Sequence, residues 1–166
     1  PAMTDVKTLR EFPREIKILI SAFVFVLTIG VTIGVIYVGY NTEYTPSGTQ
    51  TYYAGDSVTP EFEIPDQYPR SFEALLLTTH THVTAFAIIF LIMGVLMFFT
   101  DSLPGPWKLI LMIEPMASTL VTFGSFFAIR YIHGSFSYLT MVSGILMYAS
   151  YYVTAIIIFR ESISSN

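Results

Sequence analysis

The sequence predicts an all-α membrane protein: a four-helix transmembrane bundle with one extracytoplasmic loop of about 30 residues between the first two helices. Of its 166 residues, 53% are hydrophobic and only 12% are charged. Soluble domains carry about 25% charged residues, so the deficit indicates a membrane protein. Four apolar runs are each long enough to cross a bilayer core, which needs about 20 residues.

We expect spans at residues 18–40, 73–100, 108–131 and 136–159 in a single transmembrane domain that covers residues 1–166. The first run is too long for a cleaved signal peptide, and no Ala-x-Ala site closes it. Gly30 and Gly34 have the spacing that lets helices approach closely, so we expect them to serve packing. The polar and basic residues 4–17 are expected at the membrane interface.

Residues 41–72 form the predicted extracytoplasmic loop, which is acidic and rich in aromatic residues. Loops of this length in compact proteins are usually functional or disordered. The aromatic side chains favour a cap over the bundle, and residues 49–53 could form a short strand.

Basic residues in the short flanks predict the orientation. Six of them flank one side of the bundle and two flank the other. The six are Lys7, Arg10, Arg14, Lys17, Lys108 and Arg160, and the two are Arg70 and Arg130. Because positive residues favour the cytoplasmic side, we expect both termini in the cytoplasm and a bacterial inner-membrane location.

Small polar residues recur at helical spacing in the spans, including Thr119 and Thr122 in the third and Ser143 and Ser150 in the fourth. Such stripes predict hydrogen bonds between helices, with the polar faces turned inward. Arg130 and His133 continue the stripe of the third helix toward the loop side.

The main functional feature is the stretch at the start of the second span, which contains Glu73, His80 and His82. Ionisable residues at the end of a membrane span are costly and are usually functional. The two histidines are about 200° apart around a helix, so they cannot easily bind one metal ion. Glu73 shares a face with His80, and we expect one histidine to face the bundle and the other a neighbouring helix, the loop or another subunit.

Three interpretations of this end of the molecule stay open. His80 or His82 could face His133 across a b-type haem, with Arg130 on a propionate, and a quinone would use the same residue types. A Cu or Zn ion could be held by one or two of His80, His82 and His133 with Glu73 or with carboxylates of the loop, such as Glu61 and Glu63. Alternatively, the histidines only form hydrogen bonds that fix the end of the bundle.

Glu114 lies within the third span, directly before Pro115. Desolvation disfavours a charged carboxylate at this depth, so we expect it to be protonated or paired. A proton-relay or quinone contact is one interpretation, and a hydrogen bond to Ser or Thr of a neighbouring helix is the other.

The stretch Phe72-Glu73-Ala74-Leu75-Leu76-Leu77-Thr78-Thr79-His80-Thr81-His82, followed by Ile113-Glu114-Pro115 and by Arg130 before a Gly-containing turn, resembles a group of small four-span bacterial inner-membrane proteins. The resemblance implies the fold and suggests that Glu73, His80, His82, Glu114 and Arg130 belong together. It implies no reaction. A similarity to cytochrome b-like bundles is one of architecture alone.

The sequence therefore predicts a membrane subunit of an electron-transfer complex that binds haem b or quinone near the outer face. The alternatives are a cofactor-free structural or assembly subunit that docks a partner through the acidic loop, and a Cu- or Zn-handling membrane protein. The chain has no cysteines, which excludes thiolate metal sites. We expect no enzyme activity from the chain alone, contact with the lipid bilayer, a protein partner or homo-oligomer, and no nucleic-acid binding.

Overall fold

The fold is given by a computed structural model, which describes residues 8–56 and 64–164. The described chain forms one short 3-10 helix and five α-helices. They are η1 (Leu9–Glu11), α1 (Arg14–Thr42), α2 (Pro46–Ala54), α3 (Phe72–Phe98), α4 (Gly105–Tyr131) and α5 (Phe136–Ile163).

Four of these helices, α1, α3, α4 and α5, are long and apolar enough to cross a membrane. Each has 27 to 29 residues, which at 1.5 Å per residue is about 40 Å. That exceeds the ~30 Å hydrocarbon core of a bilayer. The all-α transmembrane fold expected from the sequence is confirmed, and α5 continues past residue 159 to Ile163.

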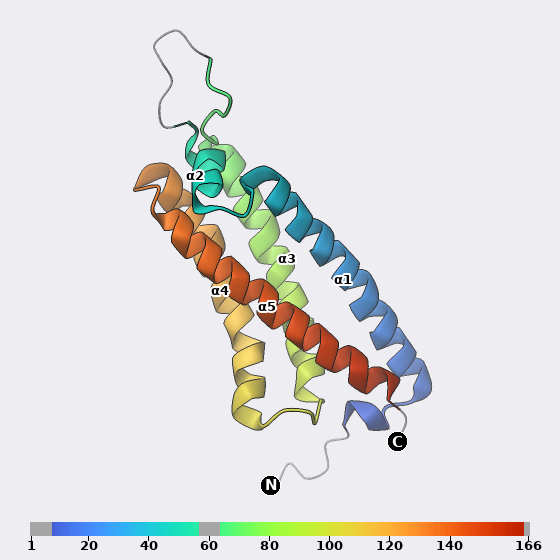
Figure 1. Cartoon of the computed structure of the whole chain (residues 1–166). Helices are drawn as coiled ribbons and strands as arrows, with labels where there is room; N and C mark the ends of the chain where they lie inside the picture. Colours follow the sequence, from blue (N-terminus) through green and yellow to red (C-terminus); the bar gives the residue numbers. More distant parts are fainter. Residues whose placement is uncertain (1–7, 57–63, 165–166) are drawn as a thin grey trace.

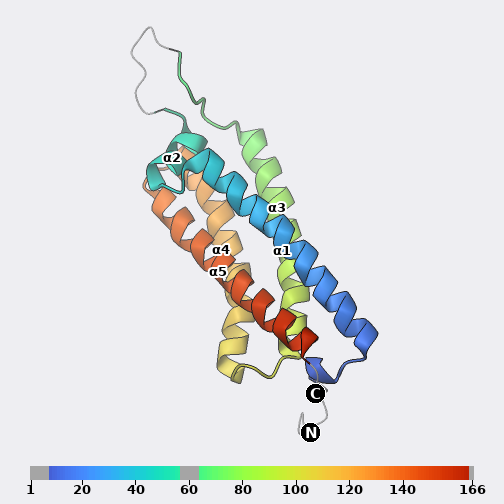
Figure 2. The same ribbon diagram turned by 45° about the vertical axis from the view of Figure 1, so that its right-hand side comes forward.

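The four long helices form a bundle in which α5 packs against α1, α3 and α4 (Figures 1 and 2). The chain runs up and down through the bundle. The start of α1 and the end of α5 therefore lie at the same end of the bundle, where both termini are found (Figure 1). We call this the termini end. The opposite end carries α2, and we call it the α2 end.

Polar stripes face inward between α4 and α5, as predicted. Thr122 donates to Ser143 Oγ at 2.7 Å, and both side chains are buried. A second buried pair, Ser125 and Thr140, is hydrogen-bonded one turn away. On α1, the hydroxyl of Thr28 lies 3.1 Å from that of Tyr151 on α5. These bonds replace water for groups that would otherwise be unsatisfied among apolar side chains.

The strand expected at residues 49–53 is wrong, because these residues lie in helix α2. Two local signals favour the helix. Pro46 occupies its first position, where a missing N–H costs nothing. Thr45 is the N-cap, and its Oγ1 accepts a hydrogen bond from the Gly48 N–H at 2.9 Å.

Helix α2 packs on α4 and α5, so it caps the bundle as the aromatic composition of the loop predicted. The ring of Tyr53 is stacked on that of Phe126, with 4.1 Å between centroids. Thr49 is the buried residue of α2. The cap fits closely at the turn between α4 and α5, where a Cβ on Gly134 would lie 2.2 Å from the Gln50 side chain.

No helix of the described chain packs closely against Gly30 and Gly34, so the packing role expected for them is not seen within the bundle. A Cβ on either residue would meet no atom within 4 Å in the described part of the chain. The long helix α1 contacts its neighbours through another face, which includes the buried residues Ile20, Val24 and Val31. The glycine face is therefore turned away from the bundle.

Candidate functional site

Helix α3, which carries Glu73, His80 and His82, begins at a side-chain N-cap. Ser71 is the N-cap, and its Oγ accepts a hydrogen bond from the Ala74 N–H at 3.1 Å. Glu73 lies in the first turn, where a negative charge is favoured by the helix dipole. From this start, the buried residues Leu75, Phe86 and Phe90 define the face that turns toward the bundle.

His82 lies on the side of α3 next to α4, although its side chain is exposed, like that of His80. Its ring is stacked on Phe123 of α4, with 5.2 Å between centroids. Its Nδ1 lies 2.8 Å from the carbonyl oxygen of Thr78, a bond that requires a proton on Nδ1 and leaves Nε2 as an acceptor. Of the two histidines on this helix, His82 is therefore the one that faces α4.

His80 lies on the opposite, outward face of α3. It is exposed, as are Glu73, Thr84 and Leu91, which share its face at helical spacing. In the described part of the chain, no hydrogen bond involves the His80 ring. The face that carries Glu73 and His80 is thus not covered by the chain's own described helices.

His133 is held locally in the turn between α4 and α5. Its Nδ1 accepts a hydrogen bond from the Ser135 N–H at 3.1 Å and lies 2.8 Å from Ser135 Oγ. The side chain is exposed. These bonds orient the ring within its own turn, and the structure does not bring it into contact with His80 or His82.

Arg130 joins the cap to the bundle. Its Nε donates to the carbonyl oxygen of Arg70 at 3.3 Å, and its guanidinium lies 5.3 Å from the Tyr131 ring centroid. Arg70 in turn lies over the Tyr52 ring at 4.2 Å, and its N–H donates to the Tyr53 carbonyl at 3.1 Å. Arg130 thus holds the segment at Arg70, which in turn is bonded to Tyr53 of α2.

Within residues 8–56 and 64–164, no group of three or more histidine and acidic side chains could hold a metal ion. The expected donors are dispersed: His80 and Glu73 point outward, His82 points toward α4, and His133 is turned to Ser135. Glu61 and Glu63, two carboxylates of the acidic loop, lie outside the described residues.

Glu114 is paired within the bundle, as one of its two interpretations predicted. One carboxylate oxygen accepts a hydrogen bond from Ser118 of the same helix, and the other accepts one from Ser150 of α5. Two hydroxyl donors replace water for this half-buried carboxylate. Glu114 therefore connects α4 to α5 far from His80, His82 and His133.

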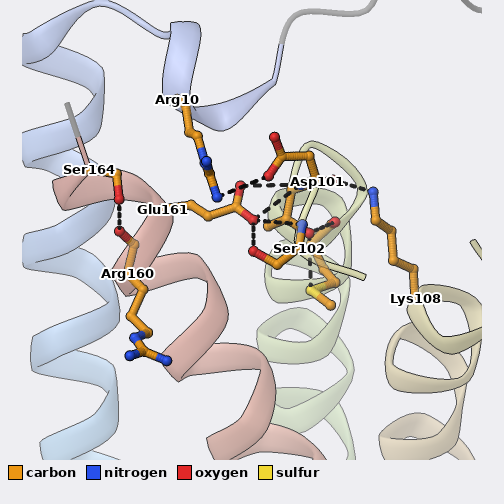
Figure 3. Close-up of polar contacts among 9 residues, drawn as sticks. Arg10, Asp101, Ser102, Lys108, Arg160, Glu161 and Ser164 are labelled. Atoms are coloured by element: carbon orange, nitrogen blue, oxygen red, sulfur yellow. Dashed lines mark hydrogen bonds and ion pairs between the residues drawn. The ribbon is translucent and has the colours of Figure 1, made fainter. Parts of the chain in front are cut away.

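The structure contains a polar cluster at the termini end that the sequence did not predict (Figure 3). Its centre is Glu161 of α5, whose side chain is 2% exposed. The Glu161 carboxylate accepts hydrogen bonds from the N–H of Asp101 at 3.1 Å, from the N–H of Ser102 at 2.9 Å and from the Ser102 hydroxyl. It thereby holds the turn between α3 and α4 against the end of α5.

The segment before α1 completes this cluster. Arg10 forms an ion pair with Asp101 at 3.3 Å. Leu9 is fully buried, and its N–H donates to the Phe99 carbonyl at 2.8 Å. The sequence contains only weak signals for this cluster. Leu9 is an apolar residue within a polar segment, and Glu161 is an isolated acidic residue near the end of the last span.

A family model for a transmembrane helical domain, Aq_1264_TM, matches residues 43–166, which contain α2 to α5 and hence every candidate residue of the α2 end. No curated protein and no solved structure matches the chain.

Proposed function

The chain belongs to the Aq_1264_TM family of transmembrane helical domains. We propose that it is a membrane subunit that binds a second membrane-embedded chain through the outward face of α3. This face is defined by Glu73, His80, Thr84 and Leu91. The observation that supports the proposal is the exposure of His80, together with Glu73, on a face that no described helix of the chain covers.

The position of His80 along the helix makes this exposure significant. His80 is followed by the uncharged run of residues 83–98, and at 1.5 Å per residue it lies about 27 Å from the far end of α3. This places it near one boundary of the ~30 Å hydrocarbon core. Lipid tails offer the imidazole no hydrogen bond, so a polar group of a partner chain is the favourable neighbour.

The test is the mass of the protein after gentle solubilisation. In size-exclusion chromatography with light scattering, we expect a protein mass above the 18.7 kDa of one chain. His80→Leu should release the single chain, because leucine removes the polar contact while remaining compatible with lipid. His133→Ala, an exposed histidine in a turn, is the matched control. A single chain in the unmodified protein, or an intact complex in His80→Leu, would refute the proposal.

A cofactor at the same surface is the second candidate. The His80 ring has no hydrogen-bond partner among the described residues, so it is the histidine most available to bind haem b, to donate to a quinone or to bind Cu or Zn. The partner chain would supply the remaining ligands, and this would make the protein a subunit of an electron-transfer complex.

An absorption spectrum with metal analysis on the intact complex separates these cases. Haem b produces a Soret band that His80→Ala should abolish and His133→Ala should retain. Bound Cu or Zn would appear in the metal analysis instead. A colourless, metal-free complex contradicts the haem and metal candidates, while the partner-binding proposal stands.

We further propose that the termini end faces the cytoplasm of a bacterial cell, with the protein in the inner membrane. The basic flanking residues support this orientation, since five of the seven in the described part of the chain belong to the termini end. The acidic segment that follows α2 would then lie on the outer side, where it is free to contact a partner.

A further inference from the structure

A groove opens between α1 and α5 at the termini end. It has a volume of about 670 Å³ and is lined by the first three turns of α1 and the last turns of α5. It lies apart from the outward face of α3 and plays no part in the proposed function. Its α1 wall is one stripe at helical spacing, which runs through Arg14, Lys17, Ser21 and Phe25.

The chemistry of this stripe changes with depth. Arg14 and Lys17 lie at the outermost turn, Ser21 lies one turn deeper, and Phe25 lies deeper still. From Arg14 to Phe25 the stripe covers about 16 Å along the helix. The α5 wall has no basic residue; Ser162, Ile163 and Ser164 line its outer end, and Phe159 lies further in. A cationic end, hydroxyl groups and then apolar rings match the phosphate, glycerol and acyl chains of a phospholipid.

Positive charge is concentrated at the outer end of the groove. The Lys17 ammonium donates to the Ser164 carbonyl at 2.7 Å and to the Arg10 carbonyl at 3.2 Å, so it is fixed in place while its charge is retained. Within residues 8–56 and 64–164 the one ion pair joins Arg10 to Asp101, so Arg14 and Lys17 pair with no described carboxylate.

The start of α1 adds a further attraction for an anion. Its N-cap residue, Pro13, provides no side-chain hydrogen bond, so the N–H groups of the first turn are uncapped. Uncapped N–H groups and the positive end of the helix dipole favour a phosphate at this position. Basic pockets between transmembrane helices bind anionic lipid headgroups in the same manner.

We propose that this groove is a binding site for one anionic phospholipid of the membrane leaflet at the termini end. The phosphate contacts Arg14 and Lys17, and an acyl chain lies along Phe25 and Phe159. Phe25 is 60% exposed and Phe159 is half-buried in the chain itself, so an acyl chain buries apolar surface that the protein leaves uncovered.

The test uses the purified full-length chain in nanodiscs of phosphatidylcholine, with and without phosphatidylglycerol, followed by native mass spectrometry and thermal unfolding. We expect one retained phosphatidylglycerol per chain and a higher Tm with it. Arg14→Gln should weaken binding about fivefold, as expected for the loss of one basic residue near anionic lipid. Ala22→Phe, which fills the groove and keeps both charges, should also prevent retention.

Arg160→Gln is the matched control, because Arg160 is exposed at the same end of α5 but does not line the groove. An equal loss in Arg160→Gln would reduce the effect to general surface attraction and overturn the proposal. The same Tm increase with inorganic phosphate alone would show an anion site without a lipid. Retention of a second copy of the chain in place of lipid, lost in Ala22→Phe, would also overturn it.

Discussion

Two acidic side chains of the bundle meet the cost of desolvation in different ways. Glu114 accepts hydrogen bonds from Ser118 and Ser150. Glu161 accepts them from the backbone of the turn between α3 and α4, and Arg10 pairs with Asp101 of that turn. Hydrogen bonds to a charged acceptor are stronger than bonds between neutral groups. Through these bonds, Glu114 connects α4 to α5, and Glu161 connects α5 to the turn between α3 and α4.

Glu161→Ala should destabilise the bundle by about 1–3 kcal/mol, because it leaves the N–H groups of Asp101 and Ser102 without their acceptor. Thermal unfolding in detergent measures the change. Glu15→Ala, which removes an exposed carboxylate from the same end of the molecule, should change stability by less than about 0.5 kcal/mol. Equal effects of the two substitutions would contradict the role assigned to Glu161.

Spacing alone predicted how the histidines are divided. The separation of His80 and His82 placed them on different faces of α3, and the structure assigns His82 to α4 and His80 to the outside. Spacing could not predict the neighbours of Glu161, because the N–H groups that donate to its carboxylate lie about 60 residues away in the sequence. That contact arises only when α3, α4 and α5 are packed together, and no local pattern encodes it.

At the scale of the elements, α2 differs from the long helices in what stabilises it. The four spans were predictable because hydropathy encodes them directly. Helix α2 has 9 residues and little apolar periodicity, and isolated helices of this length are marginal in water. Its stability depends on docking, above all on the stacking of Tyr53 on Phe126, and this contact is absent from any local sequence signal.

The docking of α2 should weaken in alkaline solution. Burial raises the pKa of the Tyr53 phenol above its ordinary value of 10.0, and the neighbouring Tyr52 raises it further while Arg70 opposes the shift. A group whose pKa is raised on folding stabilises the fold fully below its unfolded pKa, and this contribution is lost as pH rises. The loss should therefore begin near pH 10 and increase above it.

Tyr53→Phe tests this directly, since phenylalanine keeps the ring and removes the titration. The Tm of the unmodified protein should fall between pH 9 and pH 11 by more than that of Tyr53→Phe, a range chosen about the ordinary tyrosine pKa of ~10. Tyr68→Phe, at an exposed position, should behave like the unmodified protein. Identical pH profiles for Tyr53→Phe and the unmodified protein would show that Tyr53 does not control the docking.

At the scale of the whole molecule, the two ends of the bundle are built differently. The termini end is fastened by polar contacts that join η1, the turn between α3 and α4, and the end of α5 (Figure 3). The α2 end is closed by a short helix that rests on aromatic rings. Most of the basic flanking residues belong to the termini end, so the end that is held by polar contacts is also the more basic one.

This asymmetry predicts which end enters the cytoplasm, and the absence of cysteine from the sequence makes the prediction directly measurable. Glu11→Cys places a thiol at the termini end, and Ser47→Cys places one at the α2 end; both positions are exposed. In intact cells, a membrane-impermeant maleimide should label Ser47→Cys and not Glu11→Cys, because positive flanks are retained inside. After the cells are lysed, both variants should be labelled, which shows that each thiol is reactive. Labelling of Glu11→Cys alone in intact cells would reverse the orientation. It would then place the acidic segment, and with it any partner that docks there, on the cytoplasmic side.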